Sequence, residues 1–432
     1  MAIESSLILI SVFGVLAVLG VPLALSIVAA GLSAVLLLMP LDTALFTSVQ
    51  KMAASLDSFS LLAVPFFVLA GVIMNSGGIA IRLVNFAKLI AGRMPGSLTQ
   101  TNIAGNMLFG CVSGSAIAAS TSIGGVMIPL QADDGYDRNF ASAANIASAP
   151  TGMLIPPTTA FIIYALVSGG TSVGALFLGG AVAGILWALG LMVVTFVIAR
   201  KRGYGVSTGV SASEAMKITL DALPSLFLIV LIIGGIVLGV FTATEASAIA
   251  VVYTMLLAFV IHRTVPFREF PRFLLETAEM TGAIMLLLAA SSAMSFAMAF
   301  TGIPGALSDL ILGISSNPYV VLLIINVLLL VVGCFMDIGP AILIFTPILL
   351  PIATSVGMDP VHFGVVLVFN LCIGTITPPV GTGLFVGASV GKVKIEQVIP
   401  SLAPFYVVIL ALLFLVTYVP DLTLFLPRMF GL

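Results

Sequence analysis

The sequence carries one pattern twice, and both copies place helix-breaking residues inside apolar segments. In the first copy, Cys111 lies 18 residues before Pro129, which lies 27 residues before the pair Pro156-Pro157. The second copy has the same elements, 17 and 27 residues apart, at Cys334, Pro351 and Pro378-Pro379. Matching pairs 222 to 224 residues apart continue upstream: Gly78-Ile79 with Gly302-Ile303, Pro95 with Pro318, and Gly110 with Gly333. The second half therefore repeats the first, a layout typical of membrane carriers.

Composition independently indicates one integral membrane unit. Apolar residues make up 60% of the 432 residues and charged residues only 7%, with a mean hydropathy of +1.29. A soluble domain carries about 25% charged residues, so this chain lacks the charge to cover a water-facing surface. Glu4 stands where a signal peptide has basic residues, which predicts that the first apolar run is retained as a helix. Three cysteines in apolar segments indicate neither a disulfide framework nor a zinc site.

Apolar runs of about 17–25 residues, the length that spans a bilayer, predict the uninterrupted membrane helices. We place them at 5–20, 22–40, 61–75, 173–199, 223–240, 244–262, 281–301 and 399–419. Two more segments, 139–169 and 361–390, are spans interrupted by the proline pairs. The segments 97–131 and 319–354 are too long for one helix and have Gly, Ser or Asp at their centres. Each is either two full spans or a re-entrant hairpin.

The basic residues predict on which side the loops lie. If both long segments are hairpins, the inside loops are 76–96, 132–138, 200–222, 263–280 and 391–398. These loops hold 13 of the 15 Lys and Arg residues, which leaves only Lys51 and Arg428 outside. This topology has ten crossings and both termini outside. Charge does not distinguish a hairpin from two spans, but polar centres in hydrocarbon favour hairpins with limbs of about 15 residues.

The predicted fold is an all-α polytopic membrane protein with an inverted repeat. The first hairpin opens to the cytoplasm and the second to the outside, so the repeats 1–222 and 223–432 have opposite orientations. Inverted repeats are expected of alternating-access carriers. The segments 41–60 and 263–280 occupy matching places and mix charged with apolar residues. We expect them to form interfacial helices that brace a fixed scaffold.

Polar residues at membrane depth are concentrated in the hairpin tips, 110–115 and 333–340, and in the broken helices, 148–158 and 374–381. Proline donates no backbone hydrogen bond, so a Pro-Pro pair leaves carbonyls free where no water reaches. Free carbonyls and hydroxyls suit a small cation, and the helix that starts after each break favours an anion at its positive end. A mere kink is the alternative for one break, but two breaks at equivalent positions, each facing a polar tip, favour binding sites.

Asp337 is the only acidic residue that we place at membrane depth. An unpaired carboxylate there is costly, so a bound cation or protonation must offset its charge. Asp337 could also cap the helix that starts near Gly339, with or without an ion. Glu245, at an outside turn, is expected to cap a helix, and the acidic residues after the first hairpin are expected to be solvated.

Enzyme chemistry is not indicated. His262 and His362 have no Cys or Glu at metal-ligand spacing, and Ser113 and Ser115 have no base in sequence reach. A phosphate-binding loop of the GxxxxGK[ST] type does not occur, so nucleotide hydrolysis does not drive transport. A channel is the other competing class, but inversion gives two opposed half-sites and not a ring of identical ones.

Several motifs resemble the large membrane subunit of TRAP transporters, the tripartite ATP-independent periplasmic carriers. They are Cys111-Val112-Ser113-Gly114-Ser115, Asp134-Gly135-Tyr136-Asp137, Ile155-Pro156-Pro157-Thr158, Thr244-Glu245-Ala246 and the segment 374–381. The resemblance covers essentially the whole chain. It implies a sodium-driven importer with an elevator motion in a bacterial or archaeal inner membrane. It also implies a small four-helix membrane subunit, expected as a separate chain because no such extension is present, and a soluble binding protein that delivers an organic acid.

The family's sodium sites lie where hairpin tips meet broken helices, which implies two or more sodium ions. The first site would involve Ser113, Gly114, Ser115, Ser148 and Gly152, and the second Gly333, Asp337, Gly374, Thr377 and Val380. Ala149-Pro150-Thr151-Gly152 departs from the commoner run of Ser and Thr, so the ligands of the first site stay open. The acid is expected between the tips, near Ser115, Thr158, Val380, Gly381 and Thr382. It is a C4-dicarboxylate, a sugar acid, sialic acid or a keto acid; a stand-alone sodium–carboxylate symporter is the alternative function.

Overall fold

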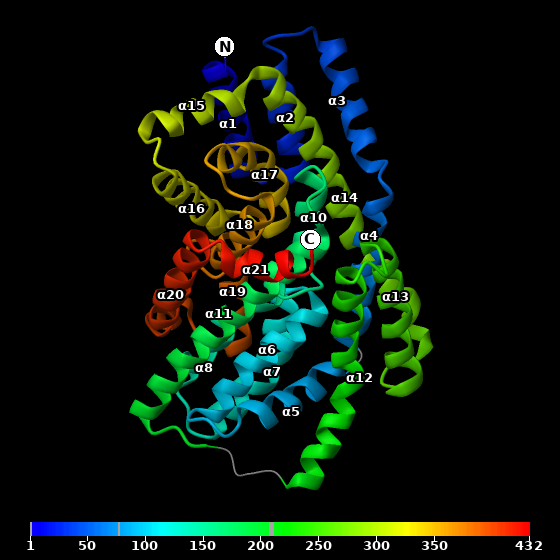
Figure 1. Cartoon of the computed structure of the whole chain (residues 1–432), viewed down its shortest axis with the longest axis vertical. Coiled ribbons are helices and arrows are strands. Elements are labelled where there is room, and N and C mark those ends of the chain that lie inside the picture. The colour runs from blue at the N-terminus through cyan, green and yellow to red at the C-terminus, as the bar shows by residue number, and fades with distance from the viewer. Residues whose placement is uncertain (1, 77, 207–210) are drawn as a thin grey trace.

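The computed structural model describes residues 2–76, 78–206 and 211–432, and every regular element in this part of the chain is helical (Figure 1). The first half contains α1 (Ala2–Val18), α2 (Leu23–Val35), α3 (Leu41–Leu56), η1 (Phe59–Leu62), α4 (Ala63–Ser76), α5 (Ile79–Ala91), α6 (Ser97–Ser113), α7 (Ala116–Asp133), α8 (Arg138–Ser148), α9 (Thr151–Leu154), α10 (Thr159–Val167) and α11 (Val173–Arg202). The second half contains α12 (Ala212–Val237), α13 (Ala243–Met255), η2 (Leu256–Ile261), η3 (Phe267–Glu269), α14 (Phe270–Thr301), α15 (Ile303–Ile314), α16 (Pro318–Phe335), α17 (Ile338–Ser355), α18 (Pro360–Thr375), α19 (Thr382–Gly391), α20 (Ile395–Tyr418) and α21 (Asp421–Met429). The prediction of an all-α protein is confirmed.

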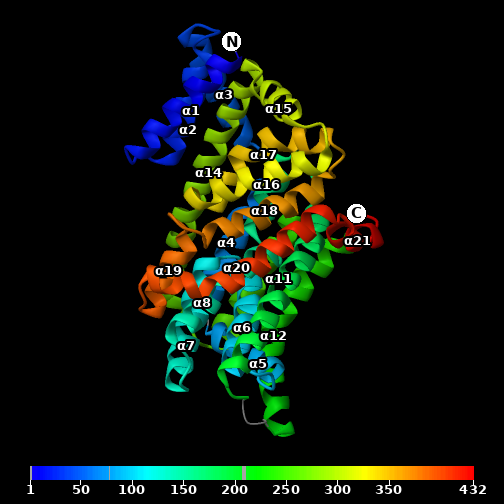
Figure 2. The same ribbon diagram turned by 90° about the vertical axis from the view of Figure 1, so that its left-hand side faces the viewer.

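The order of elements is similar in the two halves of the chain. A hairpin, a broken helix and a long helix follow one another in α6–α11 and again in α16–α20. Figures 1 and 2 place α5–α8 toward one end of the molecule and α15–α17 toward the other, so the two hairpins approach the centre from opposite ends. Residue 222, the last residue of the predicted first repeat, lies inside α12. Residues 1, 77 and 207–210, which belong to the predicted first repeat and two of its inside loops, are not among the described residues.

Both long segments form helical hairpins. The limbs α6, α7, α16 and α17 have 17, 18, 18 and 18 residues, a little longer than the predicted half-spans. By length and composition, the described residues contain 8 helices that could cross a membrane, or 9 if the bent pair α8–α10 counts as one span. The runs predicted at 5–20 and 22–40 form the shorter helices α1 and α2. The second of these ends at Val35, five residues before Pro40, whose ring cannot continue a helix.

One predicted element differs between the two halves. The segment 41–60 gives the separate helix α3, but most of the matching segment 263–280 belongs to the 32-residue helix α14. The first half breaks because Asp57 has non-helical backbone angles and Ser58 is extended before η1. No residue interrupts α14 between Phe270 and Thr301, so its interfacial part and its apolar part form one rod. The prediction of a separate interfacial helix at 263–280 is therefore wrong.

The two broken helices lie at the centre of the fold. Every residue from Phe140 to Ser148 in α8, and every residue from His362 to Thr375 in α18, is buried. The buried part of α8 is made mostly of Ala, Ser and Asn, and such small residues allow close helix contacts in a membrane protein. Trp187 of α11 packs on Phe369 of α18 with ring centroids 4.7 Å apart and donates its indole N–H to Ala147 O at 2.9 Å. The helices that lead into the two breaks are therefore buried.

A candidate substrate and ion site

The tip of the first hairpin is a two-residue connection, Gly114-Ser115. Gly114 has a positive φ of 60°, which favours glycine, and so ends α6. The Ser115 hydroxyl accepts a hydrogen bond from Ala118 N–H at 3.3 Å and caps α7. An ideal Cβ on Gly114 would lie 3.5 Å from Pro157 O and 3.9 Å from Thr158 Cα. The structure therefore brings the tip to the end of the first proline break, which the sequence had only implied.

The tip of the second hairpin places Asp337 before the first turn of α17. Asp337 has extended backbone angles at the N-cap position, but its carboxylate makes no capping hydrogen bond. It lines the central cavity described below. The carboxylate lines the cavity beside the N-terminus of α17, which is compatible with both roles that the sequence allowed.

The first break separates α8 from α10 in two steps. The short helix α9 follows Pro150, and the chain then passes the Pro156-Pro157 pair to Thr158, which caps α10 by accepting from Phe161 N–H at 3.5 Å. The helix segments on the two sides are bent by 47°. Helical hydrogen bonds to the carbonyls of Gly152 and Met153 would have to come from the two prolines, which have no N–H.

The second break is similar and holds its oxygens close together. The carbonyl of Thr375 lacks its helical donor because the residue four positions on is Pro379. An ideal Cβ on Gly381 would lie 2.6 Å from Thr377 O and 3.2 Å from Thr375 O, so both carbonyls point toward this glycine, whose φ is 35°. Gly381 N–H donates to Cys334 O at 3.2 Å and ties the break to the second hairpin.

Pairs of glycines fix how each hairpin meets its broken helix. An ideal Cβ on Gly152 would lie 2.6 Å from the carbonyl carbon of Gly110, and one on Gly374 would lie 2.6 Å from the carbonyl oxygen of Gly333. Such distances exclude any side chain. The two pairs occupy equivalent positions in the repeats. Each hairpin therefore packs backbone against backbone on its broken helix, one turn below its tip.

A central cavity of about 340 Å³ joins the two tips and the two breaks. Gly114 and Ser115 line it from the first tip, Asp337 and Pro340 from the second, and Thr375 from α18. The N-terminal residues of two half-helices, Thr159 of α10 and Thr382 of α19, also line it. The remaining wall is apolar and comes partly from α14, through Met280, Ala283, Ile284 and Leu287. The cavity is thus a site with one carboxylate, several hydroxyls, backbone oxygens and helix N-termini.

The structure brings together some, but not all, of the residues predicted from the sequence. Ser115, Asp337 and Thr382 share the central cavity, and Gly333 lies against Gly374. Ser148 lies deeper, where its hydroxyl donates to Ala144 O at 2.7 Å and accepts from Asn106 Nδ2 at 2.7 Å. Val380 is 42% exposed and does not line the cavity.

Three contributors to this region were not predicted from the sequence. Thr375 could have been predicted from the sequence, because Pro379, four residues later, has no N–H to donate to the Thr375 carbonyl. Tyr406 of α20 donates its hydroxyl to Ile376 O and so occupies another oxygen of the break. The apolar wall from α14 also carries no local signal, since its residues resemble those of any membrane helix.

The comparison with protein families decides what the chain is. A family model described as "Tripartite ATP-independent periplasmic transporter, DctM component" matches residues 9–422. The chain belongs to this family. The resemblance inferred from the Pro-Pro and hairpin motifs is confirmed, and the protein is a multi-pass TRAP transporter large permease and not an enzyme.

Individual TRAP relatives match over nearly the full chain. This chain is 49% identical to the uncharacterized protein YgiK of Salmonella typhimurium, over 98% of both chains. It is 40% identical to the sialic acid TRAP transporter large permease protein SiaM of Vibrio cholerae, over 97% of this chain and 98% of that one. Among solved structures, the YdaH transporter of Alcanivorax borkumensis has a TM-score of 0.64 at 14% identity, covering 89% of this chain and 88% of its own. This last similarity shows a shared fold.

Proposed function

We propose that this TRAP permease carries out sodium-driven uptake of an organic acid across the inner membrane. It would work with a small four-helix membrane subunit and a periplasmic binding protein that delivers the acid. The observation that supports this most is the central cavity, where two hairpin tips and two half-helix N-termini meet beside a single carboxylate, Asp337. Opposed half-sites around one cavity are what an alternating-access carrier needs.

Sodium is the cation that the oxygen groups suit. The backbone carbonyl oxygens of Thr375 and Thr377 converge beside Gly381. Carbonyl oxygens do not titrate, so they can bind a metal cation without exchanging a proton. A hard cation takes such carbonyl and hydroxyl oxygens as ligands. A proton-driven carrier, in contrast, needs carboxylates or imidazoles that change charge during transport, and the residues that line the central cavity include only Asp337 of this kind. We place one sodium near the second break and another near Ser113, Gly114 and Ser115.

The acid would bind between the two tips. The N-termini of α7, α10, α17 and α19 all contribute residues to the central cavity, and each carries a partial positive charge that favours a carboxylate. Ser115 and Thr382 add hydroxyls at these helix starts. The apolar wall from α14 would contact the carbon skeleton. Sialic acid, which names the related SiaM protein, is one acid to test, and C4-dicarboxylates, which name the related DctM protein of Rhodobacter capsulatus, are another class.

Reconstituted vesicles test the sodium proposal. With an inward sodium gradient, the small subunit and loaded binding protein, the permease should accumulate N-acetylneuraminate or succinate against its gradient. Replacing sodium by choline while imposing a pH gradient should abolish accumulation. Equal uptake under the two conditions would refute sodium coupling and leave protonation of Asp337 as the coupling step.

A stand-alone sodium–carboxylate symporter is the second candidate function. The YdaH similarity supports a shared fold and not a shared activity, so it does not decide between the two. The permease alone in sodium-loaded liposomes should show no uptake if the tripartite assembly is required. Rapid uptake by this polypeptide alone would favour the stand-alone carrier.

A further inference from the structure

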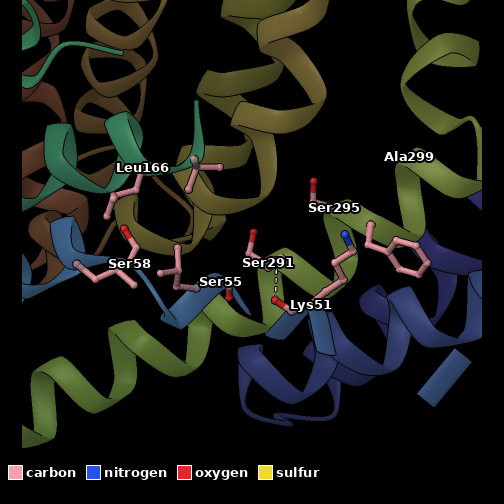
Figure 3. Close-up of a pocket in the computed structure, with 12 residues that line it drawn as sticks. Lys51, Ser55, Ser58, Leu166, Ser291, Ser295 and Ala299 are labelled. Atoms are coloured by element: carbon pink, nitrogen blue, oxygen red, sulfur yellow. Dashed lines mark hydrogen bonds between the residues drawn. The ribbon is translucent and has the colours of Figure 1, made fainter. Parts of the chain in front are cut away.

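A second cavity, which we call the serine cavity, lies beyond the central one and has a polar lining. It has a volume of about 470 Å³, and five serines line it: Ser55, Ser58, Ser291, Ser292 and Ser295. Lys51 is the only charged residue in its wall. Figure 3 shows the cavity between α3 and α14, with Leu166 of α10 across from them.

Lys51 has no carboxylate partner among the described residues, a property that it shares with most Lys and Arg residues of the chain. Arg82, Arg202, Arg272 and Arg428 each pair with Asp or Glu at 2.9–3.4 Å. The Lys51 ammonium lies 5.9 Å from the centre of the Phe296 ring, and Ser292 Oγ donates to Lys51 O at 3.2 Å. Lys51 is an exposed residue, and its backbone and side chain both contact α14.

The serines supply hydrogen-bonding groups around that charge. Within the described chain, the hydroxyls of Ser58 and Ser295 make no hydrogen bond that engages them with protein groups. Ser55, Ser291 and Ser292 each donate their hydroxyl to a backbone carbonyl, so Ser58 and Ser295 are the serines that can donate to a ligand. In Figure 3 the Lys51 amine and the Ser295 hydroxyl lie on the same side of α14. A lone cation beside free hydroxyl donors is the chemistry that binds an oxyanion.

The serine cavity continues the seam that contains the central cavity. Along α14 the central cavity is lined by residues between Met280 and Leu287, and the serine cavity by residues between Leu288 and Ala299. Along α10 the order is the same, with Ile163 in the first cavity and Leu166 in the second, about one helical turn apart. Figures 1 and 2 place the N-terminus and α15 toward this end of α14, which is the end predicted to face outside.

We propose that the serine cavity is an outer binding station for the carboxylate of the transported acid, with Lys51 as its charged group. The acid would bind there first and then pass along the α10–α14 seam to the central cavity. This rests on the proposed uptake function, because it names a step on the same path. The oxyanion is bound by Lys51, Ser58 and Ser295, and no covalent step is involved.

Charged thiol reagents test the station without any transport. Ser295→Cys is made in a Cys334→Ser background, where Cys111 and Cys372 stay buried in their native places. Reaction rates are measured with anionic 2-sulfonatoethyl methanethiosulfonate and cationic 2-(trimethylammonio)ethyl methanethiosulfonate. The anion-to-cation rate ratio should fall about tenfold in Lys51→Met and hold in Lys51→Arg, because a positive charge that lines the same cavity attracts the anionic reagent and repels the cationic one. Lys217→Met, which removes an exposed charge elsewhere, is the matched control and should leave the ratio unchanged.

A ratio that is the same with Lys51 and in Lys51→Met overturns the proposal. Ser58→Cys gives a second reporter position if Ser295→Cys does not fold. The source of the anion is separated by lipid composition: the factor by which Lys51→Met lowers the ratio should be the same in phosphatidylcholine and in phosphatidylglycerol vesicles, because the surface potential of the lipid acts equally on both proteins. Loss of the Lys51→Met effect only with phosphatidylglycerol would mean that a lipid head group fills the cavity, which contradicts a substrate station.

Occupancy by the acid is then measured with N-acetylneuraminate and succinate as probes. At least one should slow the anionic reagent, and Lys51→Met should remove that protection. Protection by neither acid contradicts the station. If the charge effect and protection hold but vesicles accumulate neither acid with sodium, the uptake proposal fails while the anion site stands. Normal sodium-driven uptake without any effect of Lys51→Met on the rate ratio would refute the station and leave the uptake proposal intact.

Discussion

At the scale of single residues, Thr377 is the most informative side chain of the second break. Its hydroxyl donates to Ile373 O at 2.7 Å, while its own carbonyl points toward Gly381 beside Thr375 O. Thr377→Ala removes the hydroxyl and loosens the carbonyl that would bind sodium. The expected loss is about 1–3 kcal/mol, the cost of an unsatisfied buried partner. The half-saturating sodium concentration for uptake should therefore rise about tenfold to a hundredfold.

Thr377→Ser, which keeps the hydroxyl, is the control and should bind sodium almost normally. Sodium titrations of uptake in vesicles make the measurement. An unchanged half-saturation in Thr377→Ala would move the sodium site away from the second break.

Asp337 is expected to matter more, because its carboxylate is the only one that lines the central cavity. In Asp337→Asn the volume is kept and the negative charge is lost, so sodium affinity should fall by more than in Thr377→Ala. Glu245→Gln is the matched control, since Glu245 accepts from Thr242 N–H at 2.8 Å in a capping box and lies outside the cavity. The same sodium titration distinguishes the two. Equal sodium affinity in the Asp337 and Glu245 variants would show that Asp337 does not contact the ion.

At the scale of elements, each hairpin is joined to its broken helix by a pair of glycines. Gly374→Ala would put a methyl group 2.6 Å from Gly333 O, so the helices must separate. Overpacking of this kind costs about 1–3 kcal/mol. Gly339→Ala is a suitable control, because nothing lies within 4 Å of the added methyl group. Thermal unfolding in detergent should show a clear decrease for Gly374→Ala and little change for Gly339→Ala; equal melting temperatures would contradict backbone-to-backbone packing.

The elements that the sequence predicted well are those with strong local signals. Prolines, glycines and apolar length located the hairpins, the breaks and most of the long helices. The continuous helix α14 was predicted as two elements. Its first part is amphipathic and its second part is apolar, and this change in pattern resembles a boundary between two helices although no helix-breaking residue lies between them. The short helix α21, which packs with Thr423 O against Gly179 of α11, was also not predicted. Contacts such as that between Tyr406 and Ile376 depend on tertiary packing and leave no pattern in either segment.

At the scale of the whole molecule, the long helix α14 lines both cavities, one after the other along its length. The central cavity uses its residues from Met280 to Leu287, and the serine cavity uses those from Leu288 to Ala299. The opposite wall comes from α10 and the hairpin tips, which belong to the packed body around α8 and α18. A rigid shift of that body along α14 would carry the central cavity from one side to the other without rebuilding it.

The final prediction tests this motion together with the predicted sides of the membrane. Asp134→Cys marks the open end of the first hairpin and Ser316→Cys that of the second, and both positions are exposed. In a background without Cys111, Cys334 and Cys372, a membrane-impermeant thiol reagent added outside should label Ser316→Cys and spare Asp134→Cys, because the 13-to-2 division of basic residues places these ends on opposite sides.

Depth is probed with Ile117→Cys and Gly339→Cys, which lie at the central cavity next to the two tips. Their labelling rates from outside should change when sodium and acid are added, since an elevator motion moves both tips together. Labelling of Asp134→Cys from outside, or tip rates that never respond to ligands, would contradict the inverted-hairpin carrier.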